Sequence, residues 1–149
     1  MAEKKQTGKE ELRYEVLFDI NIEVEDKPQE IGNTPHGIRN IYYIKGGTFE
    51  GPKLKGQVLP VGGDWLIKRP DGANELDIRT TLQTDEGDLI YTKYGGIIYR
   101  LPNSAQTYWR TVWYFETASE KLSWLNRILA VGLGDSEANV VHYKVYKIL

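Results

Sequence analysis

The stretch Tyr14-Glu15-Val16-Leu17-Phe18-Asp19-Ile20-Asn21-Ile22-Glu23-Val24-Glu25 decides the fold class of this chain. Apolar and polar side chains alternate along it, and Leu17 is the one break in the alternation. Because successive side chains of a strand point to opposite faces, this period of two predicts a long strand with one buried face. A strand of about eleven residues is longer than usual and suits the wall of a barrel.

Further strand-like segments follow at hairpin spacing, after a loop predicted over 26–37. The predicted strands are 38–45, 48–50, 54–59, 64–69, 73–83, 89–94, 97–101, 108–116, 128–132 and 139–148. Glycine pairs at 46–47, 62–63 and 95–96 predict turns between them. Thr117 and Glu120 form a capping-box pattern, so residues 117–126 are expected to hold a short helical turn.

These segments together predict an all-β fold. Short links favour antiparallel pairing, because parallel strands need long crossovers. We expect a closed or nearly closed up-and-down-type barrel of about 9–10 strands, with one short helical turn near 118–126. A sandwich of two sheets is the alternative. Residues 13–149 are expected to form this single domain, and residues 1–12, which are mostly charged and polar, a flexible N-terminal tail.

Composition excludes several classes of function. A net charge of −2 and a pI near 5.7 argue against a nucleic-acid partner, which would require a basic face. The chain has no cysteine, and its two histidines lie outside any metal-binding motif, so we expect neither a metal nor a cofactor. Residues 1–12 lack the apolar core of a signal peptide, and the apolar stretch 128–133 is too short to span a bilayer. We therefore expect a cytoplasmic protein without a membrane partner.

The strand predicted over 73–83 carries charged candidates for a site. One face holds Leu76, Ile78, Thr80 and Leu82, and the other holds Glu75, Asp77, Arg79 and Thr81. Either the apolar face is buried and the charged face meets water, or the charged face lines a roomy barrel with a polar interior. In the second orientation, Asp77 and Arg79 would be buried and paired.

Other candidates lie beside turns. Glu50 precedes a Gly-Pro bend, where its carboxylate is either a rim group aimed into a pocket or an exposed turn charge. Asp64 and Trp65 follow two glycines and present the same two alternatives. Tyr91 lies across a hairpin from the charged face of 73–83, as a proton donor or as a core aromatic. The Asn126 amide either satisfies backbone groups of a turn or orients a ligand.

Several strings, taken in order, resemble a known family. They are GGTFEGPKLKG at 46–56, VLP at 58–60, GDW at 63–65, ELD at 75–77 with Arg79, Tyr91, FET at 115–117, WLNR at 124–127 and VG at 131–132. In this order they resemble the bacterial and fungal family called domain of unknown function 3237, from about residue 14 to the C-terminus. The resemblance implies a small β-barrel that often stands alone, and no settled activity.

The resemblance also implies where a site would lie. Its motif positions are Gly47, Phe49, Glu50, Gly56, Asp64, Trp65, Asp77, Arg79, Tyr91, Thr117, Trp124 and Asn126. The chain departs from the family pattern in a shorter loop at 101–107 and in Ala118, where glycine is common. A lid or a pocket rim is therefore expected to differ in this chain.

Three functions are compatible with these residues. The first is binding of a small, partly polar organic molecule inside the barrel, with ligand-binding residues Arg79, Asp64, Trp65, Trp124, Asn126 and Thr117. The second is an isomerase, dehydratase or hydrolase without cofactor, in which Glu50 or Asp77 is the general base, Tyr91 donates a proton and Arg79 holds the substrate. The third is a structural protein that forms a homo-oligomer through exposed strand edges.

Overall fold

The computed structural model describes residues 10–149, which form ten strands and one 3-10 turn. The elements are β1 (Tyr14–Val24), β2 (Gln29–Thr34), β3 (Gly37–Glu50), β4 (Lys55–Val58), β5 (Gly63–Lys68), β6 (Asn74–Thr84), β7 (Leu89–Arg100), β8 (Thr107–Thr117), η1 (Ser123–Arg127), β9 (Ala130–Glu137) and β10 (Val140–Ile148).

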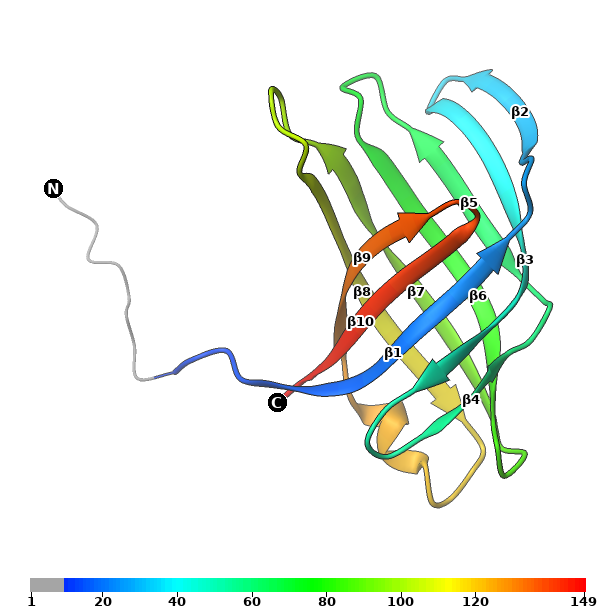
Figure 1. Cartoon of the computed structure of the whole chain (residues 1–149), viewed down its shortest axis with the longest axis vertical. Helices are drawn as coiled ribbons and strands as arrows, with labels where there is room; N and C mark the ends of the chain where they lie inside the picture. The colour runs from blue at the N-terminus through cyan, green and yellow to red at the C-terminus, as the bar shows by residue number, and fades with distance from the viewer. Residues whose placement is uncertain (1–9) are drawn as a thin grey trace, which may run out of the picture.

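The strands close into an antiparallel barrel (Figure 1). Neighbouring strands follow the order β1-β10-β9-β8-β7-β6, and pairing of β1 with β3 completes the ring. Strands β4 and β5 lie end to end in one position, because each pairs with both β3 and β6. The ring therefore has eight positions, and β2 adds to β3 outside it. The prediction of an all-β antiparallel barrel with one short helical turn is confirmed.

Two of the predicted turns are wrong. Gly46 and Gly47 lie inside β3, and Gly95 and Gly96 lie inside β7. A Cβ atom on Gly47 would lie 2.0 Å from the Asn21 carbonyl oxygen, so the glycine is needed where β1 crosses close to β3. Glycine within a strand commonly marks such a close backbone approach.

The loop predicted over 26–37 contains β2, and β9 extends to Glu137 rather than ending at 132. β2 pairs with β3 alone and is largely exposed, so it has no buried face to impose an apolar alternation. Its sequence therefore lacks the period-two signal by which the other strands were predicted.

The core contains a cluster of packed aromatic side chains. Trp113 of β8 is fully buried and stacks on Tyr94 of β7, with ring centroids 3.6 Å apart. Phe18 packs edge-on against Trp113 and Phe115. The η1 segment lies at one end of the barrel (Figure 1), and its Leu125 side chain is fully buried. One end of the barrel is therefore closed by packed side chains.

The apolar face of β6 points into the barrel. Leu76, Ile78 and Leu82 are buried, whereas the side chains of Asp77 and Arg79 are 45% and 49% exposed. The predicted pairing of Asp77 with Arg79 is confirmed at 3.8 Å, but their predicted burial is wrong. Burying both charges would cost free energy, because they would lose their contact with water, whereas burying the apolar residues of the opposite face has no such cost.

Within residues 10–149, no helix has the length and apolar character needed to cross a membrane. The predicted N-terminal tail, residues 1–12, lies mostly outside the described residues.

A pair of glycine substitutions tests the close approach of β1 to β3. Gly47→Ala is expected to lower the free energy of unfolding by roughly 1–3 kcal/mol more than Gly46→Ala, as measured by urea denaturation. Both residues have a positive φ, 148° at Gly46 and 149° at Gly47, so both variants carry similar backbone strain. Only the Gly47 methyl would collide with backbone, because the nearest atom to a Cβ on Gly46 is 3.5 Å away. Equal losses in the two variants would contradict this explanation.

Candidate functional site

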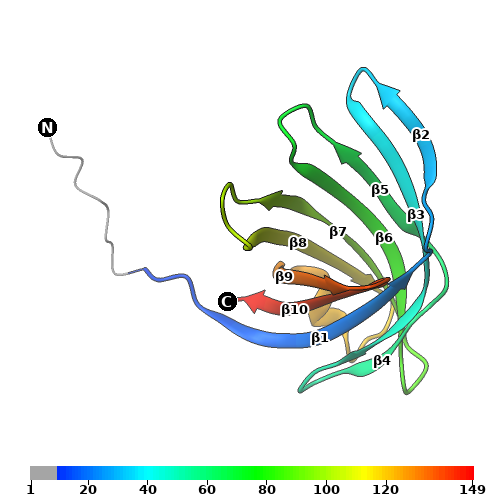
Figure 2. The same cartoon turned by 45° about the horizontal axis from the view of Figure 1, so that its top comes forward.

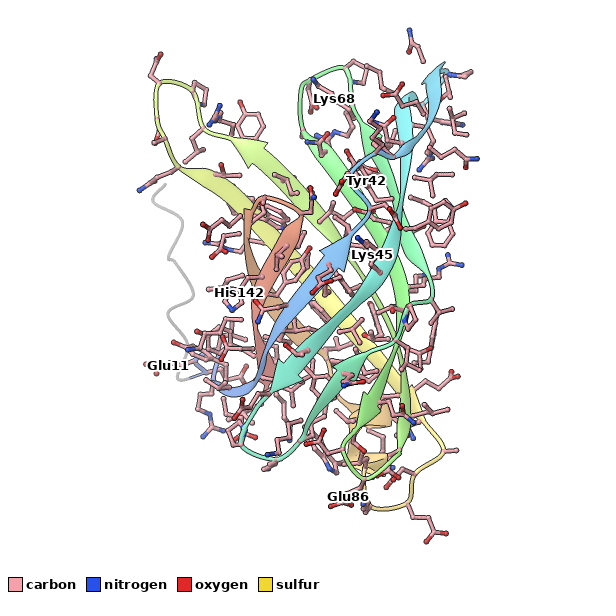
Figure 3. The ribbon with its side chains drawn as sticks, turned by 45° about the vertical axis from the view of Figure 1, so that its right-hand side comes forward. Glu11, Tyr42, Lys45, Lys68, Glu86 and His142 are labelled. Carbon is pink, nitrogen blue, oxygen red and sulfur yellow. The ribbon has the colours of Figure 1, made fainter. Side chains whose placement is uncertain are left out.

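A cavity of about 160 Å³ lies inside the barrel, towards the end opposite η1. Figure 2 shows the β2–β3, β5–β6 and β7–β8 hairpins reaching out at that end, and in Figure 3 Lys68 and Glu86 mark the two ends. Most of the wall is aliphatic: Ile22, Val24, Ile44, Leu66, Leu76, Ile78, Ile98 and Val141. The remaining lining residues are Tyr42, Asp64, Tyr94, Trp109 and Tyr143. An apolar cavity with a few polar groups is typical of a small-molecule site.

The carboxyl group of Asp64 lies at the cavity wall, where the backbone pairing between β5 and β6 is interrupted. Pairing between these strands stops after Asp64 and resumes at Ile67. In the gap, the Asp77 backbone N–H donates to Asp64 Oδ1 at 3.2 Å, and Arg39 Nη1 donates to the Trp65 carbonyl oxygen at 2.8 Å. The Asp64 and Arg39 side chains thus replace backbone hydrogen bonds that β5 and β6 do not form with each other here. The hydrogen bond from the Asp77 N–H orients the Asp64 carboxyl group.

Burial raises the pKa of Asp64 from 3.8 to about 7. The nearby Asp77 carboxylate also raises it, whereas the hydrogen bond from the Asp77 amide and the charge of Arg39 lower it. Desolvation dominates because the charged form loses water in a largely apolar wall. Near neutral pH, both the acid and the carboxylate forms of Asp64 are therefore populated, so this group can either donate or accept a proton.

A hydrogen-bonded group of aromatic residues lines the cavity as well. Trp109 Nε1 donates to the Tyr143 hydroxyl oxygen at 3.2 Å. The Tyr94 ring packs edge-on against the Tyr143 ring, with centroids 5.3 Å apart. Burial is the largest influence on both hydroxyls and raises the pKa of each, and the charge of Asp64 raises both further. Both tyrosines therefore stay neutral at physiological pH.

Among the predicted site residues, Asp64 alone lines this cavity in the described part of the chain. Trp65, Asp77 and Arg79 lie together on the outer face, where the Arg79 guanidinium is 5.8 Å from the centroid of the Trp65 ring. Tyr91 is partly exposed on the outer face of β7, and Glu50 is exposed at the end of β3. This outer cluster therefore gives no support to the predicted interior site with a buried arginine.

The three remaining predicted residues lie near η1. Asn126 accepts a hydrogen bond from the Thr117 N–H at 2.7 Å and donates to the Thr117 carbonyl oxygen at 3.0 Å. The ammonium groups of Lys53 and Lys147 both lie over the Trp124 ring, 5.5 and 5.3 Å from its centroid. The Asn126 amide thus ties η1 to the end of β8. Within residues 10–149, no group of three or more His, Cys, Asp or Glu side chains comes together as a metal site.

The sequence predictions missed Tyr94 and Tyr143 as site residues. A signal was present, since Tyr94 follows Ile90 and Thr92 at a spacing of two, and Tyr143 stands between Val141 and Val145 at the same spacing. Each tyrosine is thus the polar-tipped member of an inward-facing row.

Curated relatives cover nearly the whole chain. A UPF0311 protein of Clostridium acetobutylicum is 35% identical, and the match covers 95% of this chain and 98% of the relative. A UPF0311 protein of Rhodopseudomonas palustris is 32% identical, with 93% of this chain and 97% of the relative covered.

Solved structures share the barrel. A β-barrel-like protein of Acinetobacter baumannii superposes with a TM-score of 0.90 at 32% identity, covering 97% of this chain and 100% of that one. A Penicillium herquei protein described as an enzyme gives a TM-score of 0.75 at 24% identity, covering 95% and 99%, and shows a common fold alone. The family model described as "Protein of unknown function (DUF3237)" matches residues 12–148. The chain therefore belongs to the DUF3237 family.

Proposed function

We propose that the barrel binds a small organic molecule, about the size of one six-membered ring, in the cavity between β5, β7 and β10. The volume supports this size, since an apolar cavity of about 150 Å³ in another protein accommodates benzene. The mostly aliphatic wall favours a ligand whose surface is largely apolar.

The proposal rests on one observation. The carboxyl group of Asp64 lies in a cavity wall that is otherwise mostly apolar. Among the described residues it accepts one hydrogen bond, from the Asp77 N–H, which leaves further hydrogen-bonding capacity. A ligand with one polar group at this point is favoured, because that group gains a hydrogen-bond partner as it leaves water. Hydroxyl and carbonyl groups both qualify, because Asp64 populates both protonation states near pH 7.

Thermal unfolding with a panel of single-ring compounds tests this proposal. Cyclohexanone, cyclohexanol and phenol are suitable probes, with cyclohexane as the purely apolar reference. A probe present at 100 times its Kd is expected to add about 2.7 kcal/mol of stability. For a chain of this size that corresponds to a rise in Tm of roughly 5–10 °C.

A cavity-filling variant provides the control. Leu66→Trp places an indole in the cavity wall and is expected to abolish the rise in Tm. Leu133→Trp adds the same group at an exposed position on β9 and is expected to retain it. If no probe raises Tm, or if Leu66→Trp responds like Leu133→Trp, the cavity is not the binding site.

Chemistry on the bound molecule is a second candidate function. The Penicillium herquei barrel is described as an enzyme, which supports a search for reactive groups in this one. In this chain the observation that favours it is again Asp64, because a carboxyl group that titrates near pH 7 is suited to general acid–base catalysis.

A further inference from the structure

The Tyr143 hydroxyl has a proton without an acceptor among residues 10–149. A phenolic oxygen accepts up to two hydrogen bonds and donates one. Trp109 Nε1 donates to the Tyr143 oxygen at 3.2 Å, and the Tyr143 hydroxyl itself donates no hydrogen bond to a group within residues 10–149. The O–H of Tyr143 is thereby left to donate to a group outside this network, and the side chain lines the cavity.

Asp64 supplies the complementary group on the same cavity. Its carboxyl group lies on β5, whereas Tyr143 lies on β10, and both line the space in which a ligand would lie. The charge of Asp64 acts on both tyrosine hydroxyls, which shows that the three groups are within electrostatic reach of one another. A ligand in the cavity can therefore face a proton acceptor and a hydrogen-bond donor at once.

We propose that Asp64 and Tyr143 catalyse proton transfer at a carbon atom next to a carbonyl group of the bound molecule. Asp64 is the base, and Tyr143 binds the oxyanion that forms. Trp109 is a positioning residue, because it acts through the Tyr143 oxygen. The inference rests on the proposed ligand-binding function and specifies its ligand as a small ketone or a similar enolisable carbonyl compound.

The reaction balances without a co-reactant. The Asp64 carboxylate takes the proton of the α-carbon, the electrons of that C–H bond form a C=C bond, and the carbonyl π electrons move to oxygen. The O–H of Tyr143 donates to the resulting enolate oxygen. When the proton on Asp64 exchanges with solvent before it is returned to the same carbon, the ketone takes up a solvent hydrogen isotope, and delivery of the proton to the γ-carbon of a β,γ-unsaturated ketone shifts the double bond. A carboxylate base beside a phenolic donor in an apolar site is an established arrangement for such chemistry.

Two probes report this activity directly. The first is deuterium uptake by cyclohexanone in D₂O, followed by NMR, and the second is conversion of 3-cyclohexenone to 2-cyclohexenone, followed by ultraviolet absorbance. The full chain is expected to accelerate both. Asp64→Asn is expected to reduce the rate about 10²–10⁴-fold, as removal of a general base does. Tyr143→Phe is expected to reduce kcat about 10²-fold with little change in KM, because the donor acts on charge that develops during the reaction.

The pH profile and two further variants separate catalysis from a structural role. Besides Asp64 itself, the charged and titratable groups around it are Arg39, Tyr42, Asp77, Tyr94 and Tyr143. The rate is expected to rise tenfold per pH unit up to about pH 7 and then level off, as the carboxylate forms. Asp64→Glu is expected to restore part of the activity lost in Asp64→Asn. Glu116→Gln, on the exposed face of β8, is expected to match the parent protein.

The possible failures are distinguishable. If the ketones raise Tm but exchange no faster with the parent protein than with Asp64→Asn, the catalytic inference is overturned and ligand binding stands. If cyclohexanol or phenol binds and neither ketone does, the carbonyl ligand class is overturned alone. If no single-ring compound binds, the proposed function fails, and the catalytic inference with it.

Discussion

An Asp64→Asn variant is expected to be more stable than the parent protein at pH 8, by up to about 4 kcal/mol, and no more stable than it at pH 3. The figure follows from a pKa raised from 3.8 to about 7, since each unit corresponds to about 1.4 kcal/mol. Asparagine has nearly the same shape as aspartate, and its Oδ1 can still accept the Asp77 N–H. Partial access of solvent to Asp64 makes this figure an upper bound.

The direction of this effect follows from proton linkage. Below about pH 3.8 the carboxyl group is protonated in both the folded and the unfolded chain. Between that pH and about 7, the unfolded chain releases the proton while the folded chain retains it, so the folded chain binds more protons and loses stability as the pH rises. Above about pH 7 the folded chain carries a buried, desolvated carboxylate. Asparagine removes this loss because it does not ionise.

Urea denaturation at pH values from 3 to 8 measures the effect as a difference between the two proteins. Glu116→Gln is the matched control, because it removes one carboxylate from an exposed position on β8. Its stability is expected to follow that of the parent protein at every pH to within about 0.5 kcal/mol. A constant difference between Asp64→Asn and the parent protein across this pH range would contradict a raised pKa.

Trp113→Ala is expected to lower the free energy of unfolding by about 3–5 kcal/mol. Trp113 is fully buried at the centre of the aromatic core, stacks on Tyr94 and contacts Phe18, Phe115 and Tyr143 edge-on or stacked. Its Nε1 donates to Thr111 Oγ1 at 2.7 Å, so truncation also leaves that hydroxyl without its donor. The loss combines the missing apolar burial with the cavity that remains.

Chemical denaturation of Trp113→Ala and Tyr114→Ala distinguishes the loss of a buried side chain from the loss of an aromatic residue that favours a strand. Tyr114 is the next residue on the same strand, but its side chain points outward and is 53% exposed. We expect Tyr114→Ala to cost less than about 1 kcal/mol. Added indole is expected to recover part of the stability of Trp113→Ala by filling the space. Similar losses in the two variants would mean that Trp113 is not central to the core.

Much of the fold could be predicted because strand alternation is a local property. The row Phe18, Ile20 and Ile22 identifies an inward face without knowledge of any partner. The glycine pairs were misinterpreted as turns because their role depends on segments that are distant in the sequence. Gly47 leaves room for the backbone at Asn21, and Gly96 leaves room for the backbone at Arg110. The residues next to each glycine in the sequence do not indicate these close contacts.

The candidate site was only partly predictable. Asp64 and Asp77 are the same residue type in predicted strands, yet one lies on the cavity and the other on the outer face. In β6 the row of apolar side chains Leu76, Ile78 and Leu82 faces the barrel interior, and this places Asp77 on the outer face. For β5 the alternation carries no such information, because Asp64 points inward at an interruption of the β5–β6 ladder.

The sequence by itself determined the all-β class, most of the strands and their antiparallel pairing, because these follow from period-two alternation and short links. Only the tertiary structure decided which polar groups meet inside the barrel. Asp64, Trp109 and Tyr143 come from strands far apart in the chain, and ring closure brings them to one cavity. The raised pKa of Asp64 likewise results from burial in that cavity, a property of the assembled barrel rather than of any segment.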